Sequence, residues 1–205
     1  MLRTLRTLLA LLTLATAPGA QGGAQVYETL GDSVRAGMRA AIADNPAPRH
    51  AFADSMDAVH WLTEMSQRLE RRIPHIGTRL EFLRTVHYEA TRAGLDPQLI
   101  LSVIQVESSF RKFAVSSAGA RGYMQVMPFW IGLIGNKGDN LFKLRTSLRY
   151  GCVILRHYLD TERGDLFRAL GRYNGSLGKP EYPDMVLSAL RKGWQYQATR
   201  ASPAR

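Results

Sequence analysis

The chain has 205 residues, 45% hydrophobic and 21% charged, an ordinary composition for one globular domain with a sizeable core. Its formal net charge of +10 indicates an anionic partner, either nucleic acid or an acidic envelope polymer. We expect no nucleic-acid partner, because the chain begins with an export signal and has no basic helix motif.

Residues 1–24 have the pattern of a secretory signal peptide. Arg3 and Arg6 precede an apolar run over 8–17, and small residues follow, with cleavage expected after residue 20 or 24. The run is too short to span a membrane, and no cysteine follows it that could carry a lipid. We therefore expect an exported, periplasmic protein without a stable membrane anchor; an uncleaved anchor is the alternative.

The remainder reads as a series of helices. They are predicted over 25–48, from 52 to a stop at 71–74, and over 78–93, 96–110, 144–159, 165–172 and 182–197. Turn residues mark 136–140, and 173–178 reads as a loop. Strand signals are weak, so the predicted fold class is mainly α, and a small β element near the loop after 110 is compatible with it. Cys152 lies on an apolar helical stripe, which favours a buried role over an intermolecular disulfide.

The helix over 96–110 carries one unusual residue. Asp96 and Pro97 form a helix start, and an almost wholly apolar run then leads to Glu107. Because no Lys or Arg lies between Gly94 and Phe110, a carboxyl buried on this surface has no local partner. Desolvation would raise its pKa and suit it to act as a general acid. The alternative is a Glu at the helix end that points into water.

Small residues dominate the loop that follows, over 116–122, a composition that lets a ligand approach the backbone. Residues 123–128, Tyr-Met-Gln-Val-Met-Pro, then bring aromatic, thioether and amide groups. Between Ser108 and Gly138 there is no Asp or Glu. Glu107 therefore has no neighbouring carboxylate in the sequence that could share its acid–base chemistry.

Three motifs in this order resemble the soluble lytic transglycosylase catalytic domain, which shares its fold with goose-type lysozyme. They are Glu-Ser-Ser-Phe at 107–110, Ser-Ser-Ala-Gly-Ala-Arg-Gly-Tyr-Met-Gln-Val-Met-Pro at 116–128, and Arg-Tyr-Asn-Gly at 172–175. The third departs from the family pattern, with Arg172 in place of Ala and Gly175-Ser176 in place of Ala-Gly. The resemblance covers roughly 80–194 and implies a lysozyme-like single catalytic domain with an N-terminal helical extension.

The resemblance also implies a reaction and a set of residues. Glu107 would protonate the bond between N-acetylmuramic acid and N-acetylglucosamine, the acetamido group would attack the anomeric carbon, and the ionised Glu107 would then activate the muramyl 6-hydroxyl. The product would be a 1,6-anhydro end, formed without water. Hydroxyl, amide, thioether and phenol groups in the motifs are implied to bind the glycan: Ser116, Gln125, Met124, Met127, Tyr173 and Asn174. Core filling is the alternative role for the methionines, a turn for Ser116, and packing for Tyr173.

The predicted organisation is a signal peptide over 1–24, a helical N-terminal extension over 25–75, a transglycosylase domain over 76–197 and a flexible tail over 198–205. The expected partner is the glycan strand of peptidoglycan, while protein partners in the envelope cannot be read from the sequence. No metal or cofactor is expected, because the five histidines lack metal-ligand spacing and no phosphate loop occurs. A hydrolytic muramidase and a catalytically silent murein-binding module are the alternatives.

Overall fold

The computed structural model describes residues 24–43 and 56–196. Within these residues the chain forms eight α-helices and a short π-helix. They are α1 Asp32–Ala43, α2 Met56–Leu69, α3 Ile76–Arg92, α4 Pro97–Ser108, α5 Phe129–Ile134, α6 Leu144–Thr161, α7 Leu166–Tyr173, α8 Glu181–Ala189 and η1 Leu190–Trp194. The expected signal peptide and the C-terminal tail lie outside the described residues. The prediction of a mainly α fold is confirmed.

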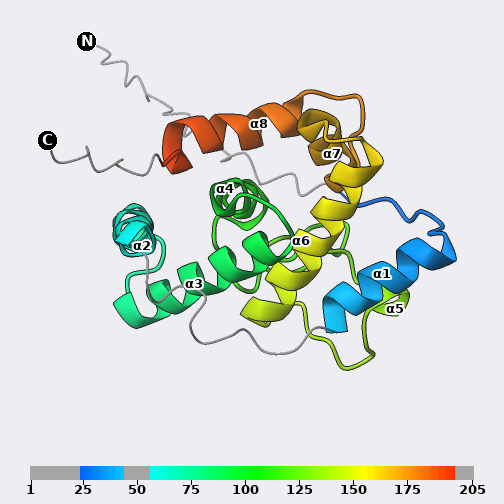
Figure 1. Ribbon diagram of the computed structural model, residues 1–205, viewed down its shortest axis with the longest axis horizontal. Coiled ribbons are helices and arrows are strands. Elements are labelled where there is room, and N and C mark those ends of the chain that lie inside the picture. The colour runs from blue at the N-terminus through cyan, green and yellow to red at the C-terminus, as the bar shows by residue number, and fades with distance from the viewer. Residues whose placement is uncertain (1–23, 44–55, 197–205) are drawn as a thin grey trace, which may run out of the picture.

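Helix α4 lies in the middle of the molecule, where Figure 1 shows it end-on, and it packs against α3, α8 and η1. Its start is the one predicted: the Asp96 side chain accepts a hydrogen bond from the Gln98 amide at 2.8 Å, and Pro97 takes the first turn. It ends where Ser109 and Phe110 adopt positive φ angles of 50° and 65°. A helix apolar on nearly every side can be stable only in such a central position.

A buried ion-pair cluster holds α1 against the rest of the fold. Glu89 of α3 is fully buried and pairs with Arg92 at 3.2 Å and with Arg149 of α6 at 3.0 Å. The same two guanidinium groups donate to the carbonyl oxygens of Ala41 and Ile42 in the last turn of α1, at 2.8 and 3.1 Å. These cations therefore both neutralise Glu89 and satisfy carbonyls that a helix end leaves unpaired.

The loop between α4 and α5 is shaped by short backbone contacts. Two isolated antiparallel bridges, Val115 with Arg121 and Arg121 with Val126, form its small β element. Gly122 has a φ of +77°, and a Cβ there would overlap the backbone carbonyl of Leu141, so the turn needs glycine at this position. The Ser108 hydroxyl donates to the Tyr123 carbonyl at 2.8 Å and fastens the loop to the end of α4.

Three sequence predictions differ from the structure in detail. The helix expected over 25–48 begins only at Asp32, and residues 24–31 run as extended chain. The spacing of their apolar residues is typical of a helix, but Val26 is 56% exposed. The segment is held by contacts with residues that lie more than a hundred positions further along the chain. The short helix α5 was not anticipated, and Tyr173 is the last residue of α7 instead of a loop residue.

No helix among the described residues is both long and apolar enough to span a bilayer.

Candidate active site

Glu107 lies in the last turn of α4 and is 5% exposed. It shares a helical stripe with Ile100, Val103 and Ile104, all of which are fully buried. The Tyr182 hydroxyl of α8 donates a hydrogen bond to Glu107 Oε1 at 2.6 Å. The carboxyl thus lies in an apolar wall with a phenol from a second helix directed at it, and it does not point into water as the alternative had it.

Burial raises the pKa of Glu107 to about 8, and the hydrogen bond from Tyr182 offsets part of that rise. The neutral acid therefore predominates at pH 7. A protonated carboxyl can accept a hydrogen bond at one oxygen while it donates its proton from the other. Glu107 is consequently equipped both to deliver a proton near neutral pH and to take one back.

Tyr173 lies close to Glu107 but does not bond to it. Its ring is fully buried, and its hydroxyl donates to the carbonyl oxygen of Met124 at 2.7 Å. Burial raises its pKa well above the usual value, the negative charge of Glu107 raises it further, and a hydrogen bond with the Gln25 side chain opposes the rise. Tyr173 is therefore a neutral brace that connects the end of α7 to the loop before α5.

The polar residues of the loop are used to shape it. Gln125, which is 3% exposed, donates through Nε2 to the carbonyls of Ala114 at 3.0 Å and Gly122 at 2.9 Å. Its φ of 48° turns the backbone into the left-handed region, which two side-chain bonds stabilise. Ser116 is partly exposed, and its Oγ accepts from the Ala120 amide at 3.1 Å.

The two methionines of the motif take different positions. Met124 is fully buried, and its side chain packs closely over Gly151 of α6, so it belongs to the core instead of lining the groove as the resemblance implies. Met127 is partly exposed, with its backbone amide turned toward the amino-terminal segment. Asn174 follows α7 and donates through Nδ2 to the Ser176 hydroxyl at 3.0 Å, which orders the adjoining turn.

Two residues of this site were not singled out from the sequence. Tyr182 contacts Glu107 directly, and Gln25 contacts the backbone at Gln125 and Met127. A signal for Tyr182 existed, because it shares the inward stripe of its helix with Val186, four residues later. Gln25 had none, since its partners lie about a hundred positions further along the chain.

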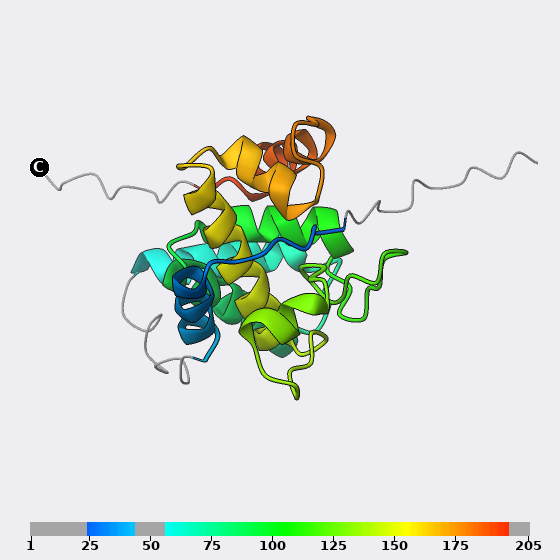
Figure 2. The same ribbon diagram turned by 90° about the vertical axis from the view of Figure 1, so that its right-hand side faces the viewer.

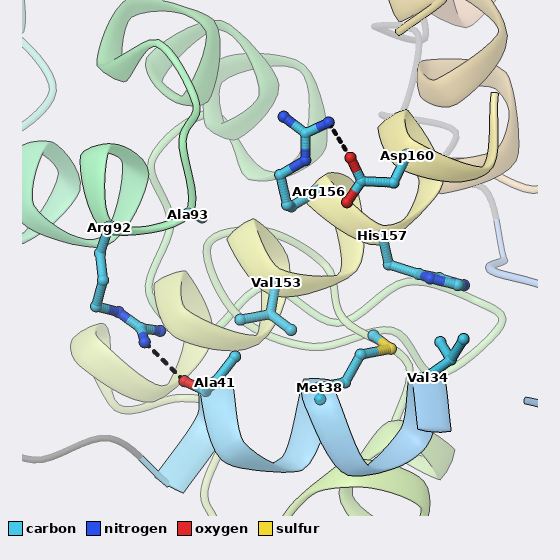
Figure 3. A pocket seen from close by; sticks show the side chains of 10 residues that line it. Val34, Met38, Ala41, Arg92, Ala93, Val153, Arg156, His157 and Asp160 are labelled. Atoms are coloured by element: carbon cyan, nitrogen blue, oxygen red, sulfur yellow. Dashed lines mark hydrogen bonds and ion pairs between the residues drawn. The ribbon is translucent and has the colours of Figure 1, made fainter. Parts of the chain in front are cut away.

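The described residues also form hollows on their surface. One of about 800 Å³ is lined by residues from the end of α4, from α8 and from η1, among them Gln105, Ser109 and Asp184. Another, of about 410 Å³, lies between α1 and α6, where Figure 3 shows Met38 and Val153 as its apolar part. An ion pair between Arg156 and Asp160 lies beside it. In the described parts of the chain no three His, Cys, Asp or Glu side chains gather as a metal site requires.

Residues 84–181 match the family model described as Transglycosylase SLT domain. The chain contains an SLT domain. It is 39% identical over 72 residues to membrane-bound lytic murein transglycosylase C of Mannheimia succiniciproducens, covering 35% of this chain and 18% of that protein. It is 31% identical over 103 residues to the transglycosylase of Enterobacteria phage PRD1, covering 50% and 38%. It is 28% identical over 172 residues to membrane-bound lytic murein transglycosylase C of Yersinia pestis (strain Pestoides F), covering 75% and 47%.

The chain thus spans less than half the length of these curated relatives. The matched SLT range begins within α3 and ends at the first residue of α8, so it holds Glu107 and the loop that follows it. Tyr182 lies just beyond this range, and Gln25 lies well before it. Two contacts of the site therefore come from outside the SLT match, one from each side of it.

Proposed function

We propose that the protein is a peptidoglycan lytic transglycosylase that cleaves the bond between N-acetylmuramic acid and N-acetylglucosamine. The observation that carries this proposal is Glu107, buried in an apolar helix wall, neutral at pH 7 and hydrogen-bonded by Tyr182. The SLT match and the similarity to lytic murein transglycosylases support the same reaction. The export signal expected over 1–24 supports a periplasmic location.

In the proposed mechanism Glu107 acts first as acid and then as base. Its proton passes to the glycosidic oxygen, and that bond breaks as the acetamido oxygen of the same muramyl residue bonds to the anomeric carbon. The carboxylate then takes the proton of the muramyl 6-hydroxyl, whose oxygen displaces the acetamido oxygen and closes the 1,6-anhydro ring. Glu107 ends protonated, as it began, and no water is consumed.

Tyr182 has a defined part in this cycle. Its hydroxyl can donate to Glu107 in both protonation states, and the bond strengthens when the carboxyl is ionised. The phenol thus limits how far burial raises the pKa, which keeps the acid and base forms within reach of each other. Ser116, Gln125, Met127, Tyr173 and Asn174 would hold or border the glycan, most of them by fixing the loop and turn that carry the contacts.

Product analysis of purified sacculi digested by the mature protein tests this function. We expect muropeptides with 1,6-anhydro ends, and a Glu107→Gln variant that folds normally should lose more than about 1,000-fold in rate, because the amide cannot release a proton. Glu81→Gln, an exposed change on α3, is the matched control. Free reducing ends would identify a hydrolytic muramidase instead, and binding without turnover would identify a silent murein-binding module.

A further inference from the structure

The extended segment over 24–30 crosses the seam between two parts of the molecule. Figure 2 shows it in blue, running past one end of α4, with α7 and α8 above it and α5 with its preceding loop below it. Residues of both walls contact it. Tyr27 meets the ring of Phe129 edge-on with centroids 5.6 Å apart, and Glu28 pairs with Arg172 of α7 at 2.9 Å. The segment therefore bridges the two sides of the site that holds Glu107.

Gln25 is the buried anchor of this segment, with 4% of its surface exposed. Its Oε1 accepts the Met127 amide hydrogen at 2.9 Å, and its Nε2 donates to the Gln125 carbonyl at 3.3 Å. The side chain is also hydrogen-bonded with Tyr173, whose pKa responds to the charge of Glu107. A primary carboxamide thus satisfies one backbone donor and one backbone acceptor of the loop, beside the residues that surround the acid.

An acetamido group offers the same two functions as this carboxamide, a carbonyl acceptor and an N–H donor on one planar unit. N-acetylated sugars carry such a group beside every reacting carbon. The Met127 amide and the Gln125 carbonyl, left without Gln25, would be a donor and acceptor pair that an acetamido group can satisfy. Gln25 therefore stands where a ligand of this chemistry can be bound.

The rest of the segment is held closely, and its one buried apolar side chain is Leu30 at its carboxyl end, which is 7% exposed. A Cβ at Gly175, whose φ is +71°, would overlap the carbonyl oxygen of Ala24, so the segment passes directly over this glycine. Val26 and Tyr27 are 56% and 59% exposed. Segments with few buried apolar contacts open at low free-energy cost, so a ligand that satisfies the same backbone groups can displace this one.

We propose that Gln25 is an internal competitor of the glycan, and that residues 24–30 form a strap which occupies an acetamido-binding position until substrate displaces it. This proposal rests on the proposed function for the identity of the glycan. The strap lowers the apparent affinity for N-acetylated sugars by the fraction of molecules in which it is docked.

The test compares binding of tri-N-acetylchitotriose and of its deacetylated counterpart by titration calorimetry, in the wild-type protein and in Gln25→Ala. If the strap is docked in nine-tenths of the molecules, the variant should bind the acetylated trimer about tenfold more tightly. The deacetylated trimer should show no such gain. Glu28→Gln removes the negative charge that pairs the strap with Arg172 and leaves Gln25 unchanged. It should give a smaller gain in the same direction, and it keeps the test valid if Gln25→Ala folds poorly.

Thr29→Ala changes an exposed side chain within the strap and should leave binding at the wild-type level. Weaker binding of the acetylated trimer in both Gln25→Ala and Glu28→Gln would overturn the proposal, because Gln25 would then be part of the site. Unchanged binding in both variants would also overturn it, because Gln25 would then not compete with the sugar. Sacculus digestion run alongside separates the two proposals. If neither the wild type nor any of the variants releases anhydro products, the proposed activity is wrong. The sugar titrations still decide the role of the strap in that case.

Discussion

Glu107 illustrates how a single residue links the fold to its chemistry. The apolar wall of α4 disfavours the ionised carboxylate. Among the described residues, the one hydrogen bond given for this carboxyl comes from the hydroxyl of Tyr182. The folded protein therefore binds a proton more tightly at this position than the unfolded chain does. Folding stability must depend on pH for this reason alone.

The direction of that dependence can be measured. Because burial raises the pKa of Glu107 from 4.5 to about 8, its contribution to stability is fully present below pH 4.5 and is lost as the pH rises toward and through 8. Glu107→Gln keeps a neutral group and should be more stable than the wild type at pH 8, by an amount on the order of a few kcal/mol. Thermal melts of both proteins at pH 5 and pH 8 check this. A difference in Tm that is the same at both pH values would contradict it.

Tyr182→Phe removes the hydroxyl group that bonds to Glu107 and keeps the aromatic ring. The hydrogen bond lowers the pKa of Glu107, so its removal should raise that pKa and move the alkaline limb of the rate profile to higher pH. We expect the maximal rate to fall about 10- to 100-fold, because the carboxylate loses the donor that stabilises it. The measurement is the rate against pH for sacculus digestion. Tyr88→Phe on α3 is the control, and an unshifted limb in Tyr182→Phe would refute the role.

At the scale of elements, local signals in the sequence were enough for the main helices. Asp96 and Pro97 determine where α4 begins because a cap acts within one turn. Residues 24–31 were misassigned as helix because the feature that fixes them, Gln25 bonded to the loop before α5, is long-range. The sequence indicates that Tyr182 lies on the inward face of its helix, but its pairing with Glu107 could not be predicted, because the two residues lie 75 positions apart.

Among the contacts between helices described here, the Glu89 cluster should contribute the most to the free energy of unfolding. Glu89→Ala would leave Arg92 and Arg149 without the buried carboxylate that they share, and we expect a loss of about 3–5 kcal/mol in unfolding free energy. Urea denaturation followed by circular dichroism provides the value. Glu81→Ala, an exposed change on the same helix, should alter stability by no more than about 0.5 kcal/mol. Equal effects of the two changes would show that the cluster is not essential for α1, α3 and α6 to pack.

At the scale of the whole molecule, the net charge of +10 acts on association more than on the fold. Binding to sacculi, which are anionic, should weaken roughly tenfold or more when the salt concentration rises from about 0.05 M to about 0.5 M. Binding to chitin, which has the same sugar chemistry without the negative charge, should change far less. Pelleting assays on both polymers provide the comparison, and equal salt sensitivity would rule out charge as the source of the preference.

The course of residues 24–30 also has a consequence for timing. They are synthesised before every group that they dock against, since the Met127 amide, Phe129, Arg172 and Gly175 all lie about a hundred positions or more downstream. Their docking surface does not exist until the chain has folded through α7. The earliest part of the described chain can therefore dock only after these later groups have been made and folded, and until then the Met127 amide and the Gln125 carbonyl are without Gln25.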